Sequence, residues 1–148
     1  MEQNSSSSQN ENSRFDGLVE SLKGSKISNS KLRDEVFNLL LDDATESPSA
    51  GKFYIFEYDP KFADKLKEWD AYPIIYAMEF KKNNLIGANI HYIRTTNARL
   101  KALNSMSFPK KTLRQYIPKR ADSIFFEIKE SEVQLLSTLP LEKFHYNR

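Results

Sequence analysis

The chain has 148 residues, no cysteine and a formal net charge of +2. This length fits one ordinary domain, and the lack of cysteine excludes disulfides and thiolate metal sites. No apolar run approaches the roughly 18 residues of a membrane span, and the N-terminus lacks the basic and apolar regions of a secretory signal. We therefore expect a protein that works in a reducing cytoplasm or in an assembly built there, with no membrane partner.

The chain begins with the low-complexity polar segment 1–12, MEQNSSSSQNEN. Such a segment buries too little apolar surface to offset the entropy lost on ordering. We expect an extended N-terminal arm that is disordered on its own and becomes ordered only against a neighbouring subunit.

Two short amphipathic helices are predicted in the next segment, 13–50. The first spans 13–24 with Ser13 as its N-cap, and the second spans 30–43. A polar linker, 45–50, follows them. We expect these helices to pack either on the chain's own body or on that of a neighbour.

Three aromatic-rich runs, at 53–58, 72–80 and 85–93, are typical of strands separated by turns. Both alternating sides of the first run are apolar, which predicts a strand covered on both faces. Gly87 indicates a bulge or a close backbone approach in the third run. The connection 62–68 is predicted as a short helical turn with Phe62 and Leu66 pointing inward.

The remaining residues are predicted as two basic helices within 95–117, a strand at 124–128 and a helix at 131–139. The apolar tail that follows 139 is expected to add a last strand or to dock elsewhere. The predicted fold class is α+β: a small twisted antiparallel sheet, or an SH3-like or OB-like barrel, with short flanking helices. Segment 51–148 would form this β-rich body.

Charge is distributed unevenly along the chain. Residues 1–50 carry nine acids and five bases, whereas residues 94–120 carry eight bases and no acid. A basic block of this kind indicates a surface for phosphates or for an acidic partner, and a solvated helix face is the alternative. We expect Lys110, Lys111 and Arg114 to share one helix face. The candidate contact residues are Arg94, Arg99, Lys101, Lys110, Lys111, Arg114, Lys119 and Arg120.

The aromatic side chains of 51–94 are interpreted mainly as scaffold. The residues assigned to this role are Tyr54, Phe56, Tyr58, Trp69, Tyr72 and Tyr92. The alternative is a base-stacking platform for single-stranded nucleic acid, which would use Tyr54, Phe56, Tyr58, Tyr72 and Tyr76.

No catalytic or metal-binding set is recognisable in the sequence. His91 lies between two apolar residues and is interpreted as a hydrogen-bonded structural residue, because its neighbours offer no ligand set. Asp59 and Asp70 are interpreted as turn formers, and a catalytic pair made by these two carboxylates is the disfavoured alternative. We expect no catalytic residue, cofactor, metal or small-molecule substrate, and hence no enzyme.

Several motifs within 51–94 resemble one family of proteins. These are Gly51-Lys52-Phe53-Tyr54, Tyr58-Asp59-Pro60-Lys61, Trp69-Asp70, Tyr72-Pro73 and Gly87-Ala88-Asn89-Ile90-His91-Tyr92. Together they resemble small proteins of T4-like tailed bacteriophages that are described as virion or DNA-end-protection proteins. Leu139-Pro140 and Phe144 resemble the end of that family, and residues 1–50 lie outside the resemblance.

The resemblance implies two functions. The first is a structural virion component, a neck, tail or baseplate adaptor that holds neighbouring virion proteins together through its arm and body. The alternative is a nucleic-acid-binding accessory protein that protects DNA ends through the basic segment 94–120. Both imply a protein that resides in the virion and is assembled in the host cytoplasm.

Overall fold

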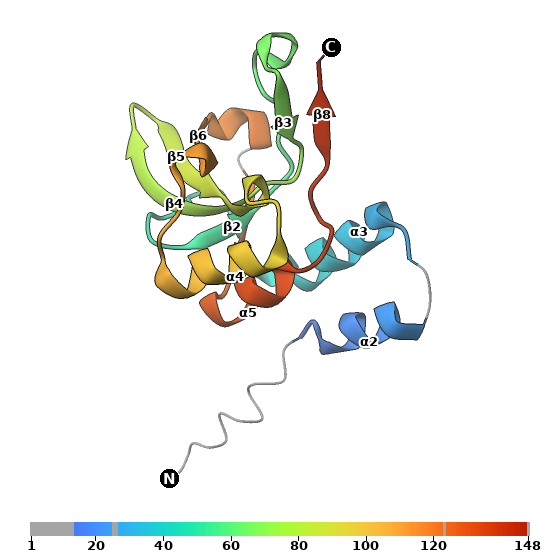
Figure 1. Ribbon diagram of the computed structural model, residues 1–148. Helices are drawn as coiled ribbons and strands as arrows, with labels where there is room; N and C mark the ends of the chain where they lie inside the picture. Colours follow the sequence, from blue (N-terminus) through green and yellow to red (C-terminus); the bar gives the residue numbers. More distant parts are fainter. Residues whose placement is uncertain (1–13, 25–26, 123, 148) are drawn as a thin grey trace.

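The computed structural model describes residues 14–24, 27–122 and 124–147 (Figure 1). The predicted arm 1–12 and the predicted N-cap Ser13 lie outside these residues. The α-helices are α2 (Asp16–Gly24), α3 (Asn29–Leu39), α4 (Thr96–Ser105) and α5 (Glu130–Ser137). The strands are β1 (Ala44–Thr45), β2 (Phe53–Ile55), β3 (Glu68–Asp70), β4 (Ile74–Lys81), β5 (Asn84–Asn89), β6 (Leu113–Tyr116), β7 (Phe125–Ile128) and β8 (Phe144–Tyr146).

Six of the strands form one antiparallel sheet in the order β1-β7-β2-β4-β5-β6, and β3 pairs with β8 in a second, two-stranded sheet. The α+β class is therefore confirmed. The large sheet is open, because β1 and β6 are its two edges, so the alternative of a closed SH3-like or OB-like barrel is wrong. Figure 1 shows the four helices gathered on one side of this sheet.

Strand β2 is buried on both of its faces, as its alternation predicts. Phe53 and Ile55 belong to a core that includes Leu32 and Val36 of α3 and Leu136 of α5. This core also contains Leu18 of α2, so the two N-terminal helices pack on the chain's own sheet.

The opposite face of the sheet holds a second core, which is mainly aromatic. Tyr54 of β2 and Phe56 and Tyr58 beyond it pack with Tyr116 and Phe125. The ring centroids of Phe56 and Tyr116 lie 5.4 Å apart, and those of Tyr58 and Tyr116 lie 5.0 Å apart. Residues 56–58 therefore lie over β6, four places along the sheet from β7, and the sheet curls around this aromatic cluster without closing.

Gly87 allows the β4–β5 ribbon to pack tightly. It pairs with Ala77, and a Cβ atom placed on it would lie 2.9 Å from Ile75 Cδ1 and 3.2 Å from the Tyr76 carbonyl oxygen. The close backbone approach predicted for Gly87 is thus confirmed. The irregularity in strand pairing does not lie at Gly87 but in the partner strand β4, between Ala77 and Glu79.

The helix predicted for the basic segment after Phe108 is wrong. A single 3-10 turn, Lys110–Thr112, leads into strand β6, which pairs with the edge of β5. In this strand, Tyr116 is buried and its neighbour Gln115 is exposed, which is the two-residue period of a strand. Pairing with a free sheet edge overrides the local helical pattern here.

Three smaller predictions also differ from the structure. The turn at 62–68 forms a 3-10 helix, Ala63–Lys65, but Phe62 and Leu66 point outward, with 59% and 39% of their surfaces exposed. The third strand ends at Asn89, because the Asn89 side chain accepts a hydrogen bond from the His91 backbone and starts a 3-10 turn, Ile90–Tyr92. The start of the predicted linker forms β1 with β7.

We predict that Gly87→Ala destabilises the protein by about 1–3 kcal/mol, because the added methyl group has to displace Ile75 or the backbone of β4. Urea unfolding at pH 7 measures this change. Gly17→Ala in α2 is the matched control, since a Cβ there meets no atom within 4 Å and alanine favours a helix. Equal stability of Gly87→Ala and the wild type would contradict the packing described for β4 and β5.

Candidate nucleic-acid interface

A hollow of about 130 Å³ lies where the two sheets meet, with aromatic walls. We call it the aromatic hollow. Its lining comes from the loop before β3, from β3, from Tyr92 and from β6. The lining residues are Tyr58, Pro60, Leu66, Glu68, Trp69, Asp70, Tyr92, Arg114, Gln115 and Tyr116. Three predicted scaffold aromatics, Tyr58, Trp69 and Tyr92, thus meet at one site with a predicted basic contact, Arg114.

Two guanidinium groups flank the ring of Tyr92. The Arg114 guanidinium carbon lies 3.9 Å from the Tyr92 ring centroid, and that of Arg94 lies 5.6 Å from it and 4.4 Å from the Phe144 ring. Stacking on aromatic faces holds such planar cations in place while their edges stay available for hydrogen bonds. Burial raises the pKa of the Tyr92 phenol, with Arg114 opposing the shift, so the phenol is neutral at pH 7.

The two arginines differ in their remaining partners. Arg94 Nη2 donates to Glu68 Oε2 at 2.7 Å. Arg114 Nη1 donates to the backbone carbonyls of Lys111 and Leu113, at 2.7 and 2.8 Å, and Arg114 forms no ion pair with a carboxylate of the described residues. Arg114 therefore brings an uncompensated positive charge to the hollow, which suits an anionic group such as a phosphate.

Below the hollow, the side chain of Asp70 joins three segments of the chain. Its Oδ2 lies 2.6 Å from His91 Nδ1 and accepts from Asn89 Nδ2, while its Oδ1 accepts from the backbone N–H groups of Tyr72 and Lys143. Burial raises the pKa of Asp70, but the electrostatic interaction with His91 and these hydrogen bonds outweigh it, so the pKa lies below its ordinary value of 3.8.

These contacts also show the structural roles of the residues that the sequence offered as possible catalytic or metal-binding groups. His91 is fully buried against Asp70, and the bond from Tyr72 to Asp70 is the predicted Asx turn. Asp59 instead lies at the surface, where it pairs with Arg120 at 2.9 Å. The two carboxylates thus have separate partners and do not form a catalytic pair. No group of three metal-ligating side chains occurs in the part of the chain that the structure describes.

The eight predicted basic residues do not form one surface. Arg99 is 6% exposed, and its guanidinium donates to the carbonyls of His91, Ile93 and Ser137 and to Glu142. The contact role predicted for Arg99 is therefore wrong, because its donors are used inside the molecule. Lys101 is exposed on α4, within the helical layer.

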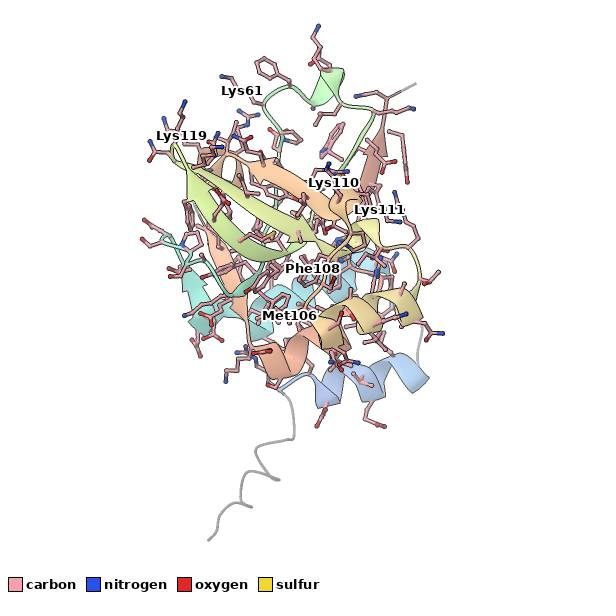
Figure 2. All side chains as sticks on the ribbon, turned by 60° about the vertical axis from the view of Figure 1, so that its left-hand side comes forward. Lys61, Met106, Phe108, Lys110, Lys111 and Lys119 are labelled. Atoms are coloured by element: carbon pink, nitrogen blue, oxygen red, sulfur yellow. The ribbon has the colours of Figure 1, made fainter. Side chains whose placement is uncertain are left out.

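The other predicted lysines lie on the sheet side of the molecule. Figure 2 shows Lys110, Lys111 and Lys119 above the helical layer, with Lys61 farther still from it. All four are exposed and form no ion pair with a described carboxylate. The shared helix face predicted for Lys110, Lys111 and Arg114 is wrong, since these residues lie in a 3-10 turn and a strand.

The predicted aromatic stacking platform does not form. Tyr54 and Phe56 are buried in the aromatic core, Tyr72 lies beneath the Arg33 guanidinium at 4.6 Å from its ring centroid, and Tyr76 stacks on Phe108. What sequence reasoning missed is the loop 59–67, whose Lys61, Lys65 and Lys67 are exposed beside the hollow. The signal in the sequence is the alternation of lysine with Phe62 and Leu66, a pattern that a packed turn also fits.

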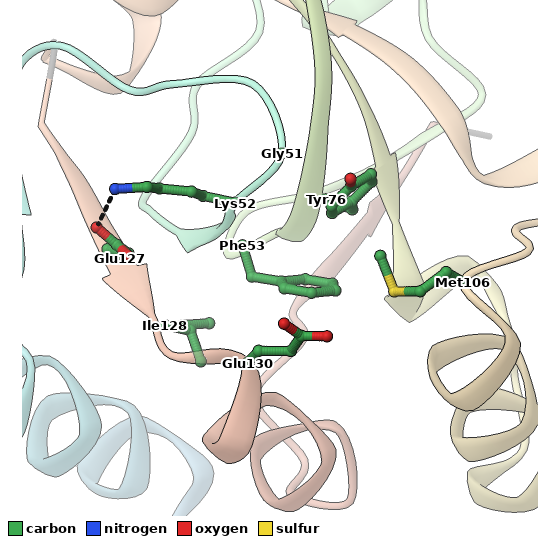
Figure 3. A pocket seen from close by; sticks show the side chains of 8 residues that line it. All are labelled: Gly51, Lys52, Phe53, Tyr76, Met106, Glu127, Ile128 and Glu130. Atoms are coloured by element: carbon green, nitrogen blue, oxygen red, sulfur yellow. Dashed lines mark hydrogen bonds and ion pairs between the residues drawn. The ribbon is translucent and has the colours of Figure 1, made fainter.

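A second hollow, of about 350 Å³, lies between β2, β4, α4 and α5 (Figure 3). Glu127 and Glu130 line it, and its lysine, Lys52, pairs with Glu127 at 3.4 Å. Glu130 has no ion-pair partner among the described residues, so this hollow keeps an unpaired carboxylate, which disfavours a phosphate. In the aromatic hollow, by contrast, Glu68 pairs with Arg94 and Asp70 contacts His91.

The comparisons with known proteins identify the family of the chain. The chain matches the model of a bacteriophage protein family concerned with DNA termini, over residues 19–108, which is more than half of its length. The chain belongs to the family described as the Phage T4 terminal DNA protecting protein. No curated protein and no solved structure matches it.

The match confirms the resemblance inferred from the motifs of 51–94 and extends it toward the N-terminus, into α2. It ends at residue 108, so Arg114, Lys110 and the resemblance suggested for Leu139, Pro140 and Phe144 lie outside the matched range. Loop 59–67, Trp69, Tyr92 and Arg94 lie within it. Among the described residues, no helix has the length and apolarity needed to cross a bilayer.

We predict that Asp70→Asn lowers the free energy of unfolding at pH 7 by about 3 kcal/mol, because an amide cannot accept all the hydrogen bonds that the buried carboxylate accepts from Tyr72, Asn89 and Lys143. The pKa of Asp70 is lower in the folded state, so its contribution is complete above pH 3.8 and is lost as pH falls through the lowered value. Urea unfolding between pH 3 and pH 7 should therefore show the difference between wild type and variant shrinking below about pH 4.

The matched control is Asp59→Asn, whose carboxylate is 77% exposed in its pair with Arg120. Exposed pairs contribute little, so this control should change stability by less than about 1 kcal/mol. A difference between Asp70→Asn and wild type that does not depend on pH would contradict the ionised state described for Asp70.

Proposed function

We propose that this chain protects DNA ends by binding duplex DNA beside its terminus and covering it. The observation that carries the proposal is the juxtaposition of the aromatic hollow with the uncompensated charge of Arg114, in a chain that belongs to a terminal DNA protecting family. Phosphate contacts supply most of the affinity of such a protein and fix its position on the duplex.

The proposed contact residues follow from the charge analysis. Arg114 and Arg94 would bind phosphates at the mouth of the hollow, and Lys110, Lys111 and Lys119 would extend the positive surface along the adjoining edge of the sheet. The Arg94–Glu68 pair is exposed on its arginine side, so a phosphate can compete for that guanidinium at low cost.

Protection of this kind requires no chemical step by the protein. A nuclease that begins at a DNA end is blocked when the terminus is covered, so we propose a binding protein and not an enzyme. The match favours this function over that of a neck, tail or baseplate adaptor, because the family description refers to terminal DNA. Contact with other virion proteins remains a prediction from the sequence.

We predict that the triple variant Lys110→Gln, Lys111→Gln, Arg114→Gln binds a short blunt duplex more weakly than wild type and with a shallower salt dependence. Each lost phosphate contact should reduce the slope of log affinity against log salt by about one. Fluorescence anisotropy of a labelled duplex between about 50 and 200 mM KCl measures both quantities.

Lys101→Gln is the matched control, because Lys101 is an exposed lysine of the same basic segment but lies on α4. An equal loss in Lys101→Gln would show that only net charge matters. Digestion by an exonuclease supplies the functional readout: wild-type protein should slow degradation of a linear duplex, and the triple variant should not. Absence of DNA binding by wild type at about 50 mM salt would overturn the proposed function.

A further inference from the structure

The loop 59–67 displays apolar surface at one end of the molecule. Three lysines and two acids lie in this loop, and Asp59, one of the acids, pairs with Arg120, so Asp64 is the acid that offsets the lysine charge. Phe62 is 59% exposed and Leu66 is 39% exposed, while three exposed lysines flank them, Lys61, Lys65 and Lys67. Lys61 Nζ lies 5.3 Å from the Phe62 ring centroid. Figure 2 shows Lys61 at the end of the molecule farthest from the helical layer.

Both ends of this loop are fastened to the body. At its start, Arg120 donates to the Asp59 carbonyl at 2.7 Å and to the Asp59 carboxylate at 2.9 Å. At its end, Asn147 donates through its side-chain amide to the carbonyls of Ala63 and Leu66 and through its backbone N–H to that of Lys67. Because both ends of the loop are held by hydrogen bonds, its backbone loses little conformational entropy when it binds a ligand.

The loop is continuous with the proposed DNA surface. Pro60 and Leu66 form part of the wall of the aromatic hollow, together with Arg114 and Trp69. Phe62 belongs to the same loop as Pro60 and Leu66. A duplex whose phosphates lie on Arg114 would therefore have its adjacent nucleotides beside this loop. The loop also belongs to the range that matches the family, whereas Arg114 does not.

The chemistry of this loop fits one feature of DNA in particular. Base pairs inside a duplex are stacked on both faces, but the terminal pair exposes one flat apolar face, with phosphates at its rim. An exposed aromatic ring stacks on such a face without regard to sequence, and flanking lysines suit the surrounding phosphates.

We infer that the loop 59–67 caps the terminal base pair of duplex DNA, with Phe62 stacked on its open face and Lys61, Lys65 and Lys67 on the adjacent phosphates. The inference rests on the proposed function and adds to it the means by which an end is distinguished from internal duplex. Leu66 would fill the space between the capped pair and the hollow.

The experiment compares the full chain on two DNA probes of identical sequence: a blunt linear duplex and a covalently closed dumbbell that has no free end. Wild type should bind the linear duplex at least about tenfold more tightly, the order of one stacked base. Phe62→Ala should lose this preference while keeping its affinity for the dumbbell, and Phe62→Trp should retain the preference. Phe80→Ala, at an exposed phenylalanine beside Lys81 and Lys82 on the β4–β5 hairpin, should behave as wild type.

The position of the contact is read from 2-aminopurine placed either in the terminal pair or at the centre of the linear duplex. Wild type should change the fluorescence of the terminal probe only, and Phe62→Ala should not. Equal binding of linear and closed DNA by wild type would overturn the cap but leave the DNA-binding function standing. Failure of wild type to bind either probe would overturn both. If Phe62→Ala keeps the end preference but loses self-association in sedimentation or binding to anionic vesicles, the loop serves that other partner and the cap is overturned.

Discussion

The buried carboxylate of Asp70 is the interaction on which the site depends. It accepts hydrogen bonds from residues of three segments, around Tyr72, at 89–91 and at Lys143. Two aromatic walls of the hollow adjoin this network, because Trp69 precedes Asp70 and Tyr92 follows His91. A single ionised group that faces several donors has a low energy only when all of them are in place. The position of Tyr92, one residue beyond His91, and hence of both arginines beside it, follows from this arrangement.

The arginines of the basic segment are used in two different ways. Arg99, the most deeply buried of the basic residues singled out from the sequence, satisfies carbonyl groups of the 3-10 turn after β5 and of the end of α5. The guanidinium groups of Arg114 and Arg94 instead lie near the ring of Tyr92, and both side chains remain accessible to solvent. Arginines of one basic segment thus have two roles: the buried one stabilises the fold, and the accessible ones can contact a ligand.

Much of the fold could be predicted from local sequence, and the site could be predicted only in part. The β4–β5 hairpin, the buried β2 and the strand at 125–128 follow from periodicity and turn chemistry. β6 could not be predicted, because its strand character comes from the free edge of β5 and not from Leu113-Arg114-Gln115-Tyr116 itself. The sequence predicts Phe62 and Leu66 inside because apolar residues usually are buried, and only the three-dimensional arrangement of the loop shows that both side chains are exposed to solvent.

The short sheet formed by β3 and β8 has a consequence for how the protein matures. Asn147 and β8 fasten a loop that lies about eighty residues earlier in the chain, through Glu68–Tyr146 and Trp69–His145 pairs and the bonds to Ala63 and Leu66. On the ribosome, this loop remains without its fastening until residues 144–147 have emerged, since these contacts are the most distant in sequence that the loop makes. The central part of the sheet can form before that moment, whereas the surface that we propose for DNA is completed last.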